Sequence, residues 1–310
     1  KDTPVALISW ATRYNQRVIT STLENVYETA VRENVKPPTL IAIGDVVKLR
    51  DKLNFFESKP LFGKNVIVTR SRTQSSSLVS KISDLGGNPI EVPTIKIEKI
   101  ENNVALENEI KNIKDYTYLI LTSKNAVDIF FDKLDEMDLD SRSLSNLKVC
   151  AIGSATAKEI KNRGIKADIV PEKFVAEYLF EELKDILKDS DKVLIPRAKN
   201  ARDFLVDKIS EICEVKEVRT YETVLDDSKK EEVLEVLNSG DADYITFASS
   251  STVTNFVDII GQENIDKLNK LKVISIGPIT TQTVKGLNIN VYKEAEVSTI
   301  DGIIDSIMNY

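Results

Sequence analysis

The sequence predicts an α/β protein with parallel sheets, and three observations support this fold class. From Lys64 onward, ten short apolar runs rich in β-branched residues alternate with stretches of helical periodicity. The runs are continuously apolar rather than alternating, which is typical of central parallel strands covered by helices on both faces. The runs also fall into two sets of five, with similar motifs in the same order. We therefore expect two flavodoxin-like parallel-sheet domains.

The repeat is clearest where "LKVCAIGSATAKEI" in the first set matches "LKVISIGPITTQTV" in the second. Each segment passes from an apolar run through Ile-Gly into a helix start rich in small and hydroxyl-bearing residues. The spacing is regular, because Ser123 and Ser249, which follow the third run of each set, are 126 residues apart. A repeated strand, turn and helix predicts a repeated binding surface.

The second run of each set is unusual. The segments "PIEVPTIKIEKI" and "VKEVRTYETVL" are longer than an average strand and become polar toward their ends. One explanation is that both leave their sheets and pair with each other, so that the chain crosses twice between the domains. We therefore predict a two-stranded β-ladder that joins one domain, of residues 64–94 plus 224–310, to a second domain of residues 95–223. Each domain would combine early strands of one repeat with late strands of the other.

The chain before Lys64 has a different character. Residues 1–57 contain two strand-like runs and two helical stretches, which is too little for a self-sufficient α/β domain. The segment "ESKPLFGK" contains Pro and Gly and marks a boundary, so we expect a linker at residues 58–63. The predicted fold is thus two complete α/β domains preceded by a truncated one.

Composition excludes several classes of function. The formal net charge is -7 and no basic stripe is present, which argues against nucleic acid as a partner. The absence of His removes the commonest general base and the commonest metal ligand, so we expect neither a Ser-His-Asp triad nor a metal site. No apolar run approaches the length of a membrane span, and we expect no membrane partner. Because Cys150 and Cys213 are the only cysteines, we expect no disulfide framework and a cytoplasmic location.

Polar side chains gather where the predicted strands end. In an open parallel sheet, ligands bind outside the carboxyl ends of the strands, where helix N-termini offer unpaired N–H groups. Hydroxyl, amide and basic side chains at these ends can host carboxylates or phosphates through charge-assisted hydrogen bonds. The sequence therefore predicts a polyanionic ligand. The competing interpretation is that each of these residues is a simple helix N-cap.

Specific motifs give the chain a resemblance to a known family. From about residue 62 to residue 308 it resembles uroporphyrinogen-III synthase, whose half-repeats carry a "VTR" opening, a "TSxNAV" segment and an "AIGxxTA" turn. These motifs stand here at Val68–Arg70, Thr122–Val127 and Ile152–Ala157. The segments "FASSSTV" and "IGPITT" resemble the most recognisable late motifs of that family.

The resemblance implies a reaction and a ligand. The reaction is the cyclisation of hydroxymethylbilane to uroporphyrinogen III, with inversion of ring D, loss of water and no cofactor, in the biosynthesis of tetrapyrroles such as haem, sirohaem and cobalamin. The substrate carries eight carboxylates, which agrees with the polyanionic ligand predicted above. We place substrate binding on the strand-end residues Thr69, Arg70, Ser123, Asn125, Ser154, Arg197, Ser250, Ser251, Pro278 and Thr280.

Residues 1–57 are similar to the C-terminal end of uroporphyrinogen-III C-methyltransferase, through "TPVALISWAT" and "PPTLIAIGDVVKLRDKLNFFE". The first glycine-rich S-adenosylmethionine-binding motif of that family is not in this sequence. We therefore expect methyl transfer, with S-adenosylmethionine as cofactor, from an intact methyltransferase half in a fused parent protein and not from this fragment. The resemblance is also compatible with a dimer of the full-length protein that forms through its methyltransferase half.

The sequence offers two tyrosines as candidates for the proton-transfer residue and does not decide between them. The resemblance implies a tyrosine as the candidate acid, and Tyr178 and Tyr221 are the two candidates, whereas the competing interpretation of each is an ordinary packed side chain. Two other functions also compete with the synthase. One is a non-catalytic two-domain protein that binds a polyanion, and the other is a methyltransferase domain for which the remaining chain is a scaffold.

Overall fold

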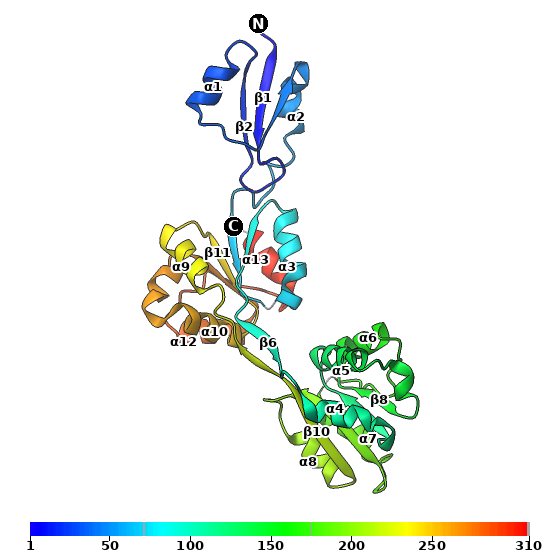
Figure 1. Ribbon diagram of the computed structural model, residues 1–310. Helices are drawn as coiled ribbons and strands as arrows, with labels where there is room; N and C mark the ends of the chain where they lie inside the picture. The colour runs from blue at the N-terminus through cyan, green and yellow to red at the C-terminus, as the bar shows by residue number, and fades with distance from the viewer. Residues whose placement is uncertain (71, 174, 309–310) are drawn as a thin grey trace. The chain divides into compact units, whose positions relative to one another are not determined.

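The computed structural model describes residues 1–70, 72–173 and 175–308 (Figure 1). Contacts between residues divide the chain into two units. Unit 1 comprises Lys1–Lys96 and Leu225–Tyr310, and unit 2 comprises Ile97–Val224. Each unit contains a five-stranded sheet, and unit 1 also contains a three-stranded sheet near the N-terminus.

The N-terminal sheet is antiparallel, with the strand order β2-β1-β3. Its strands are β1 (Pro4–Ser9), β2 (Arg17–Thr22) and β3 (Thr39–Ile43). The helices of this segment are α1 (Val26–Arg32), η1 (Asp45–Leu49) and α2 (Arg50–Leu53). The sequence analysis predicted β1 and β3 but missed β2, because its polar and partly exposed side chains do not form an apolar run.

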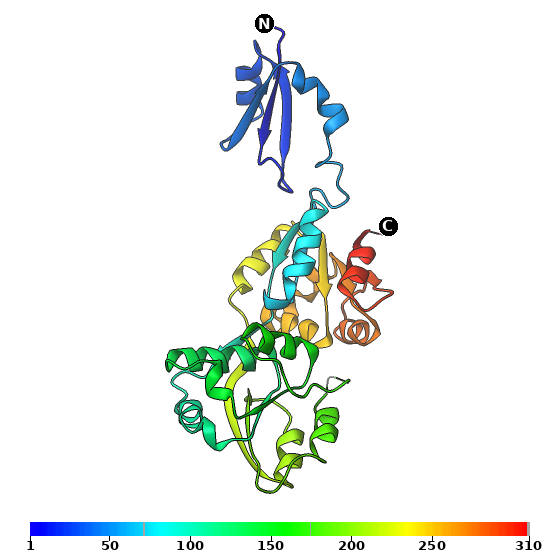
Figure 2. The same ribbon diagram turned by 90° about the vertical axis from the view of Figure 1, so that its right-hand side faces the viewer.

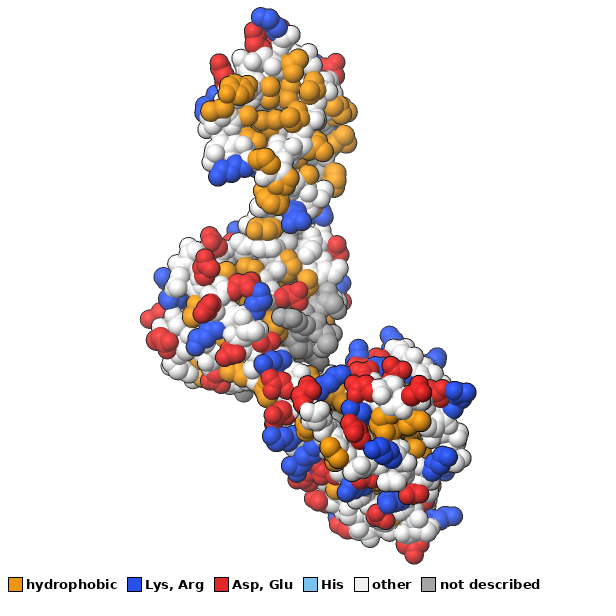
Figure 3. Space-filling model, viewed as in Figure 1, with side chains coloured by type: hydrophobic (Ala, Val, Ile, Leu, Met, Phe, Trp, Pro, Cys, Tyr) orange, Lys and Arg blue, Asp and Glu red, His pale blue; other side chains and the backbone are white. Residues whose placement is uncertain are grey.

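Apolar side chains are widely exposed on this N-terminal segment (Figure 3). Among residues 1–57, all of which are described, the buried apolar residues are Val5, Ala6 and Leu7. By contrast, Tyr27 is 77% exposed and Phe55 is 72% exposed. The segment therefore has a much smaller core than either five-stranded sheet.

The five-stranded sheet of unit 1 is parallel throughout, in the order β13-β12-β11-β4-β5. Numbered along the chain from β4, this is the order 2-1-3-4-5 of flavodoxin. The strands are β4 (Asn65–Val68), β5 (Asn88–Glu91), β11 (Tyr244–Phe247), β12 (Lys272–Ser275) and β13 (Lys293–Glu294).

Two cores cover the faces of this sheet. On one face, Leu78 of α3 and Ile303 of α13 pack with alternate strand residues such as Val68. On the other face, Phe256 of α10 packs with Phe247. The helices of unit 1 beyond the N-terminal segment are α3 (Arg72–Asp84), α9 (Lys230–Ser239), α10 (Ser250–Ile260), η4 (Gln262–Asn264), α11 (Ile265–Leu268), α12 (Pro278–Gly286) and α13 (Ile300–Met308).

The sheet of unit 2 has the order β6-β10-β9-β7-β8, and its pairs β10-β9, β9-β7 and β7-β8 are parallel. The strands are β6 (Ile95–Lys99), β7 (Tyr118–Leu121), β8 (Lys148–Ala151), β9 (Lys192–Ala198) and β10 (Glu214–Leu225). The predicted strand "KADIVP" makes a single bridge, between Ile169 and Cys150. The prediction of an α/β fold with parallel sheets is thus confirmed in both units.

Helices also lie on both faces of the unit 2 sheet, which Figure 2 shows in a second view. Phe130 of α5 and Ile160 of α6 pack on one face, whereas Leu179 of α7 and Leu205 of α8 pack on the other. The helices are α4 (Val104–Lys111), η2 (Ile113–Asp115), α5 (Lys124–Glu136), η3 (Ser141–Leu144), α6 (Ser154–Asn162), α7 (Ala176–Leu183) and α8 (Phe204–Ser210).

The chain passes between the units within β6 and β10, which are neighbours in the sheet. Backbone hydrogen bonds flank β6 on both sides. The Ile100 N–H donates to the Thr220 carbonyl at 3.0 Å, and the Asp226 N–H donates to the Thr94 carbonyl at 3.1 Å. The later residue of one segment thus pairs with the earlier residue of the other, as in antiparallel strands.

Gly302 in α13 provides a test of the packing in unit 1. A Cβ atom at this position would lie 2.0 Å from the Val297 carbonyl oxygen. Gly302→Ala should therefore lower the free energy of unfolding by about 1–3 kcal/mol, the usual cost of overpacking. Gly286→Ala is the matched control, because Gly286 ends α12 with nothing within 4 Å of the added atom. Thermal unfolding should give a lower Tm for Gly302→Ala alone, and equal Tm values for both variants would contradict the close contact.

Candidate functional site

The structure joins two of the predicted site residues in unit 2. Ser123 follows β7 and is the N-cap of α5, where its Oγ accepts a hydrogen bond from the Ala126 N–H at 3.1 Å. The same Oγ lies 2.8 Å from the Tyr221 Oη, and either hydroxyl can be the donor. Tyr221 lies in β10 and is 6% exposed. Residues from distant parts of the sequence thus form one partly buried hydroxyl pair at the carboxyl ends of the strands.

Tyr178 has different surroundings. It lies in the first turn of α7, which packs on the opposite face of the sheet from α5, and it is 41% exposed. Its Oη accepts a hydrogen bond from the Lys173 Nζ at 2.6 Å, and the same ammonium lies 4.6 Å from the ring centroid. The structure therefore brings Tyr221, and not Tyr178, into contact with another predicted site residue.

Asn125 and Ser154 lie at two neighbouring helix starts. Asn125 is half-buried in the first turn of α5, and Ser154 is the exposed first residue of α6. The N-cap of α6 is Gly153, which has no side chain to accept from the first N–H groups. Because β7 and β8 are adjacent parallel strands, both helix starts lie at the same edge of the sheet. Such an edge offers N–H groups and hydroxyls to an anion.

Arg197 lies at the end of β9 and is 2% exposed. Its Nη1 donates to the Arg202 carbonyl at 2.6 Å, and its Nη2 pairs with Asp203. Its Nε lies 3.0 Å from the Glu217 Oε1, which is an ion-pair distance, although the N–H direction does not meet hydrogen-bond geometry. Burial opposes the charge, but Glu217 and Asp203 outweigh burial and raise the pKa of the guanidinium. The guanidinium of Arg197 is thus already bonded to, or paired with, groups of the protein itself.

A cavity of about 260 Å³ lies beside Arg197. Thr122, Ile152 and Arg197 line it, so it opens at the ends of β7, β8 and β9. Arg202 also lines the cavity, and its Nη1 lies 3.0 Å from the Glu177 Oε1 in an exposed ion pair. The lining of this cavity combines apolar side chains with two arginines, and both arginines are already paired with carboxylates of the protein.

The predicted residues of unit 1 follow three adjacent strands. Thr69 follows β4 and is fully buried, and its Oγ1 donates to the Thr246 carbonyl at 2.8 Å. Arg70 comes next in the chain and is half-buried. Because β4, β11 and β12 are neighbours in a parallel sheet, the segments that follow them share one edge. The Thr69 hydroxyl, however, is bonded within the sheet.

The other four residues of unit 1 lie at the starts of α10 and α12. The Ser250 Oγ donates to the Ile279 carbonyl at 3.3 Å, which links the two helix starts. Ser251 and Pro278 are exposed, and Thr280 is buried. Within unit 1 the structure therefore brings Ser250, Ser251, Pro278 and Thr280 together, as the sequence predicted only from their positions after strands.

Ser249 is a further candidate site residue, which the sequence analysis left out of its substrate-binding list. It is the N-cap of α10 and forms a capping box with Thr252, whose N–H donates to the Ser249 Oγ at 3.3 Å. Ser249 therefore has the same position in unit 1 that Ser123 has in unit 2. The spacing of 126 residues between them was a signal that could have found it.

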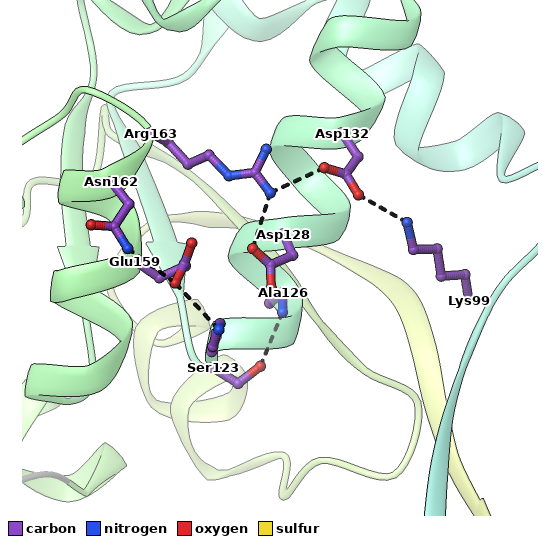
Figure 4. Close-up of polar contacts among 9 residues, drawn as sticks. Lys99, Ser123, Ala126, Asp128, Asp132, Glu159, Asn162 and Arg163 are labelled. Carbon is purple, nitrogen blue, oxygen red and sulfur yellow. Dashed lines mark hydrogen bonds and ion pairs between the residues drawn. The ribbon is translucent and has the colours of Figure 1, made fainter. Parts of the chain in front are cut away.

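A polar network holds α5 against α6 and β6 in unit 2 (Figure 4). Arg163, which follows α6, lies 3.0 Å from Asp128 and 3.1 Å from Asp132, both on α5. Lys99 of β6 lies 2.9 Å from the other oxygen of Asp132. These contacts fix the axis of α5, and with it the position of Ser123 at the start of the helix.

Other reactive groups are scarce among the residues that the structure describes. Over these residues, no group of three or more His, Cys, Asp or Glu side chains is placed to hold a metal ion. None of the helices in the same ranges combines the length and the apolar character that a membrane span requires. Cys150 and Cys213 are buried, which raises the pKa of both thiols, that of Cys150 to about 12. Neither thiol is therefore an activated nucleophile.

Comparison with known proteins gives a family match. The model of the family described as uroporphyrinogen-III synthase HemD matches residues 76–305. The chain is 37% identical over 309 residues to the porphyrin biosynthesis protein HemD of Ruminiclostridium josui, a match that covers 99% of this chain and 60% of that protein. It is 30% identical over 254 residues to a uroporphyrinogen-III synthase of Synechococcus elongatus, covering 79% of this chain and 95% of the relative. The chain thus spans about 60% of the length of the first relative and almost all of the second.

A solved structure supports the fold. The crystal structure of a mutant uroporphyrinogen III synthase from the extremely thermophilic bacterium Thermus thermophilus matches with a TM-score of 0.51 at 15% identity, and covers 79% of this chain and 97% of that one.

A partial match to the uroporphyrinogen-III C-methyltransferase of Bacillus subtilis has 32% identity over 161 residues, which is 52% of this chain and 32% of that protein. The predicted resemblance to the synthase is confirmed, whereas a fused methyltransferase is not shown by this partial match and stays a prediction.

Asp132 provides a test of the network that holds α5. Burial disfavours the carboxylate, but hydrogen bonds and charge from Lys99 and Arg163 outweigh it and hold the pKa of Asp132 below its usual value. A lowered pKa in the folded state stabilises the protein above the pKa of the unfolded state, near 4, and this stabilisation is lost as the pH falls through the folded pKa. Asp132→Asn should therefore be less stable than wild type at neutral pH, by a difference that shrinks below about pH 4.

The measurement is chemical denaturation of wild type and Asp132→Asn across this pH range. Asp135→Asn is the matched control, because Asp135 is an exposed aspartate of the same helix. A difference between wild type and Asp132→Asn that stays constant with pH would contradict the account of the network.

Proposed function

Since the chain belongs to the uroporphyrinogen-III synthase family, we propose that it cyclises hydroxymethylbilane to uroporphyrinogen III, with inversion of ring D and loss of water. The observation that carries the proposal is the position of the predicted residues, which follow adjacent parallel strands in each sheet. Hydroxyls and first-turn N–H groups at such positions suit the carboxylates of a tetrapyrrole. Ring closure with loss of water is neither an oxidation nor a reduction, so the proposed reaction draws on no cofactor.

The proposal assigns residues 64–94 plus 224–310 to one synthase domain and residues 95–223 to the other. A two-stranded ladder of β6 and β10 would join them. Support comes from the division of the chain into two units, which falls within these two strands, and from the backbone hydrogen bonds on either side of β6. As an enzyme of tetrapyrrole biosynthesis, the protein is placed in the cytoplasm under this proposal.

Tyr221 is the proposed proton donor. Departure of the hydroxyl group of hydroxymethylbilane as water requires a proton, and a positioned side chain can supply it. Tyr221 fits this role better than Tyr178, because it is buried and its Oη contacts the Ser123 Oγ at the strand ends. The substrate-binding residues proposed around it in unit 2 are Ser123, Asn125 and Ser154. Arg197 is the weakest member of the proposed set, since Asp203 and Glu217 already neutralise it.

Residues 1–57 are proposed to belong to a methyltransferase domain. In a longer parent protein, the intact domain would bind S-adenosylmethionine and methylate uroporphyrinogen III, and it could form a dimer through that half. The partial match to a uroporphyrinogen-III C-methyltransferase supports this part of the proposal. The small core of the segment gives it little capacity to act alone.

Product analysis tests the proposed function. The protein is incubated with freshly generated hydroxymethylbilane, the products are oxidised to porphyrins, and the type I and type III isomers are resolved. An excess of type III over the spontaneous type I product is the expected result. Type I alone would contradict the proposal, and a tight complex with uroporphyrinogen III without turnover would favour the non-catalytic protein that binds a polyanion.

Substitution of the two tyrosines separates the candidate acids. Tyr221→Phe should lower the rate of type III formation by about a hundredfold, the lower range for loss of a general acid. Tyr178→Phe makes the same chemical change on an exposed tyrosine of the same unit and should have little effect. If Tyr178→Phe gave the larger loss, the role of acid would pass to Tyr178.

A further inference from the structure

Beyond the reaction itself, we propose that Thr220 is a positioning residue that turns Tyr221 toward Ser123 by means of a β-bulge. The proposal rests on the proposed function only for its effect on turnover. The positioning itself is a property of β9 and β10 in unit 2.

The bulge is visible in the register of β10 against β9. Arg219 lies opposite Arg197, and Tyr221 lies opposite Ala198, the next residue of β9. Two steps along β10 therefore correspond to one step along β9. Thr220 is the extra residue, as in a β-bulge, which bends a strand locally and changes the direction of the side chains that follow.

The direction of Tyr221 depends on this extra residue. Val218 and Tyr221 both pack in the core that contains Phe130 of α5. Residues three apart in a regular strand point to opposite faces of a sheet. Without the bulge, Tyr221 would point toward the opposite core, which contains Leu205 of α8, and away from Ser123. A regular strand of this sequence could therefore not form the Tyr221–Ser123 pair.

Contacts on both sides of the bulge hold it in place. The Thr220 side chain is fully buried, and its Oγ1 donates to the Arg197 carbonyl on β9 at 3.2 Å. Beyond the bulge, the Lys199 N–H donates to the Tyr221 carbonyl at 2.7 Å. Before the bulge, Glu217 pairs with the guanidinium of Arg197. Arg197 thus binds β10 through its side chain and through its carbonyl, which gives a buried arginine at the strand end a role without any ligand.

Thr220 is the member of this set that can be changed with least disturbance. Val has nearly the same shape as Thr but cannot donate a hydrogen bond. Thr220→Val should therefore keep the packing and remove the bond to the Arg197 carbonyl. A small displacement of the Tyr221 Oη would follow, and a displacement of about 1 Å can cost roughly a hundredfold in rate.

A double-mutant cycle with Tyr221→Phe separates positioning from a merely structural role. Thr220→Val should lower the rate of type III formation by roughly ten- to a hundredfold in the wild-type background. In the Tyr221→Phe background it should cause little further loss, because residues that act as a unit are not additive. Thr220→Ser keeps the hydroxyl and should restore most of the rate. An equal loss in both backgrounds would overturn the proposal.

Thr246→Val is the matched control for the cycle. Thr246 is also a buried threonine of a central strand, and its Oγ1 donates to the Ile67 carbonyl on the neighbouring strand at 3.2 Å, but it lies in unit 1. The rate lost on Thr246→Val should be the same with and without Tyr221→Phe, because Thr246 bonds to Ile67 and Tyr221 to Ser123, and effects of residues without a common partner are additive. If the rate loss caused by Thr246→Val disappeared in the Tyr221→Phe background, the cycle would be reporting general destabilisation. That result would overturn the positioning role of Thr220.

A second measurement does not depend on turnover. In protein labelled with ¹³C at the tyrosine Cζ, the Tyr221 signal is identified by its loss in Tyr221→Phe. Ser123→Ala and Thr220→Val should move this signal in the same direction, and Thr246→Val should leave it in place. An unmoved signal in Thr220→Val would overturn the positioning. If the wild-type protein made no type III isomer, the proposed function would be refuted. The ¹³C signal of Tyr221 would still show whether Thr220 positions Tyr221.

Discussion

Parallel strand direction is the constraint on which the rest of this structure depends. When neighbouring strands run the same way, every connection must return across a face of the sheet, and every following helix begins at the same edge. In unit 1 this gathers the segments that follow β4, β11 and β12, and in unit 2 those that follow β7, β8 and β9. The sequence places hydroxyls at all of these starts except the one after β9, so that N-caps and first-turn N–H groups gather at one edge of each sheet. The anion binding proposed for each edge rests on strand direction and not on any single residue.

The strand β10 adds a second constraint. Its 12 residues begin in the parallel sheet of unit 2, pass a bulge, and end where unit 1 resumes. A long strand without an irregularity would keep one alternation of side chains along its whole length. The bulge changes this alternation once, and the change places Tyr221 on the α5 face. The buried Arg197 then has a structural explanation, because it ties β9 to both sides of the irregularity.

Sequence patterns predicted the fold correctly where a residue type is typical of one kind of secondary structure. Continuous β-branched runs indicated the parallel strands, and the hydroxyls after them indicated the helix starts. Strand β2 was missed because an exposed polar strand needs its partner β1 to be recognised, and "KADIVP" forms only a bridge. The long run before Lys99 divides into β5 and β6 around Pro93, which cannot donate a hydrogen bond to a neighbouring strand.

The partners of the site residues were beyond the reach of sequence patterns. Glu217 and Asp203 reach Arg197 only because β10 lies beside β9 and the following loop folds back, which no local pattern encodes. The same holds for Tyr221, whose contact with Ser123 depends on one extra residue in a strand. The proposal of Tyr221 rather than Tyr178 as the acid therefore draws on contacts that the sequence does not reveal.

The claim that the carboxyl-end edges bind the carboxylates of a tetrapyrrole can be tested most directly by amide NMR. The ¹⁵N-labelled protein is titrated with uroporphyrinogen III, which is kept reduced under anaerobic conditions. The account predicts that the amide signals in the first turns of α5 and α10 move, together with that of Tyr221, while those at the opposite ends of the strands, such as Tyr118 and Tyr244, stay in place. Changes confined to the amino ends of the strands or to residues 1–57 would contradict it.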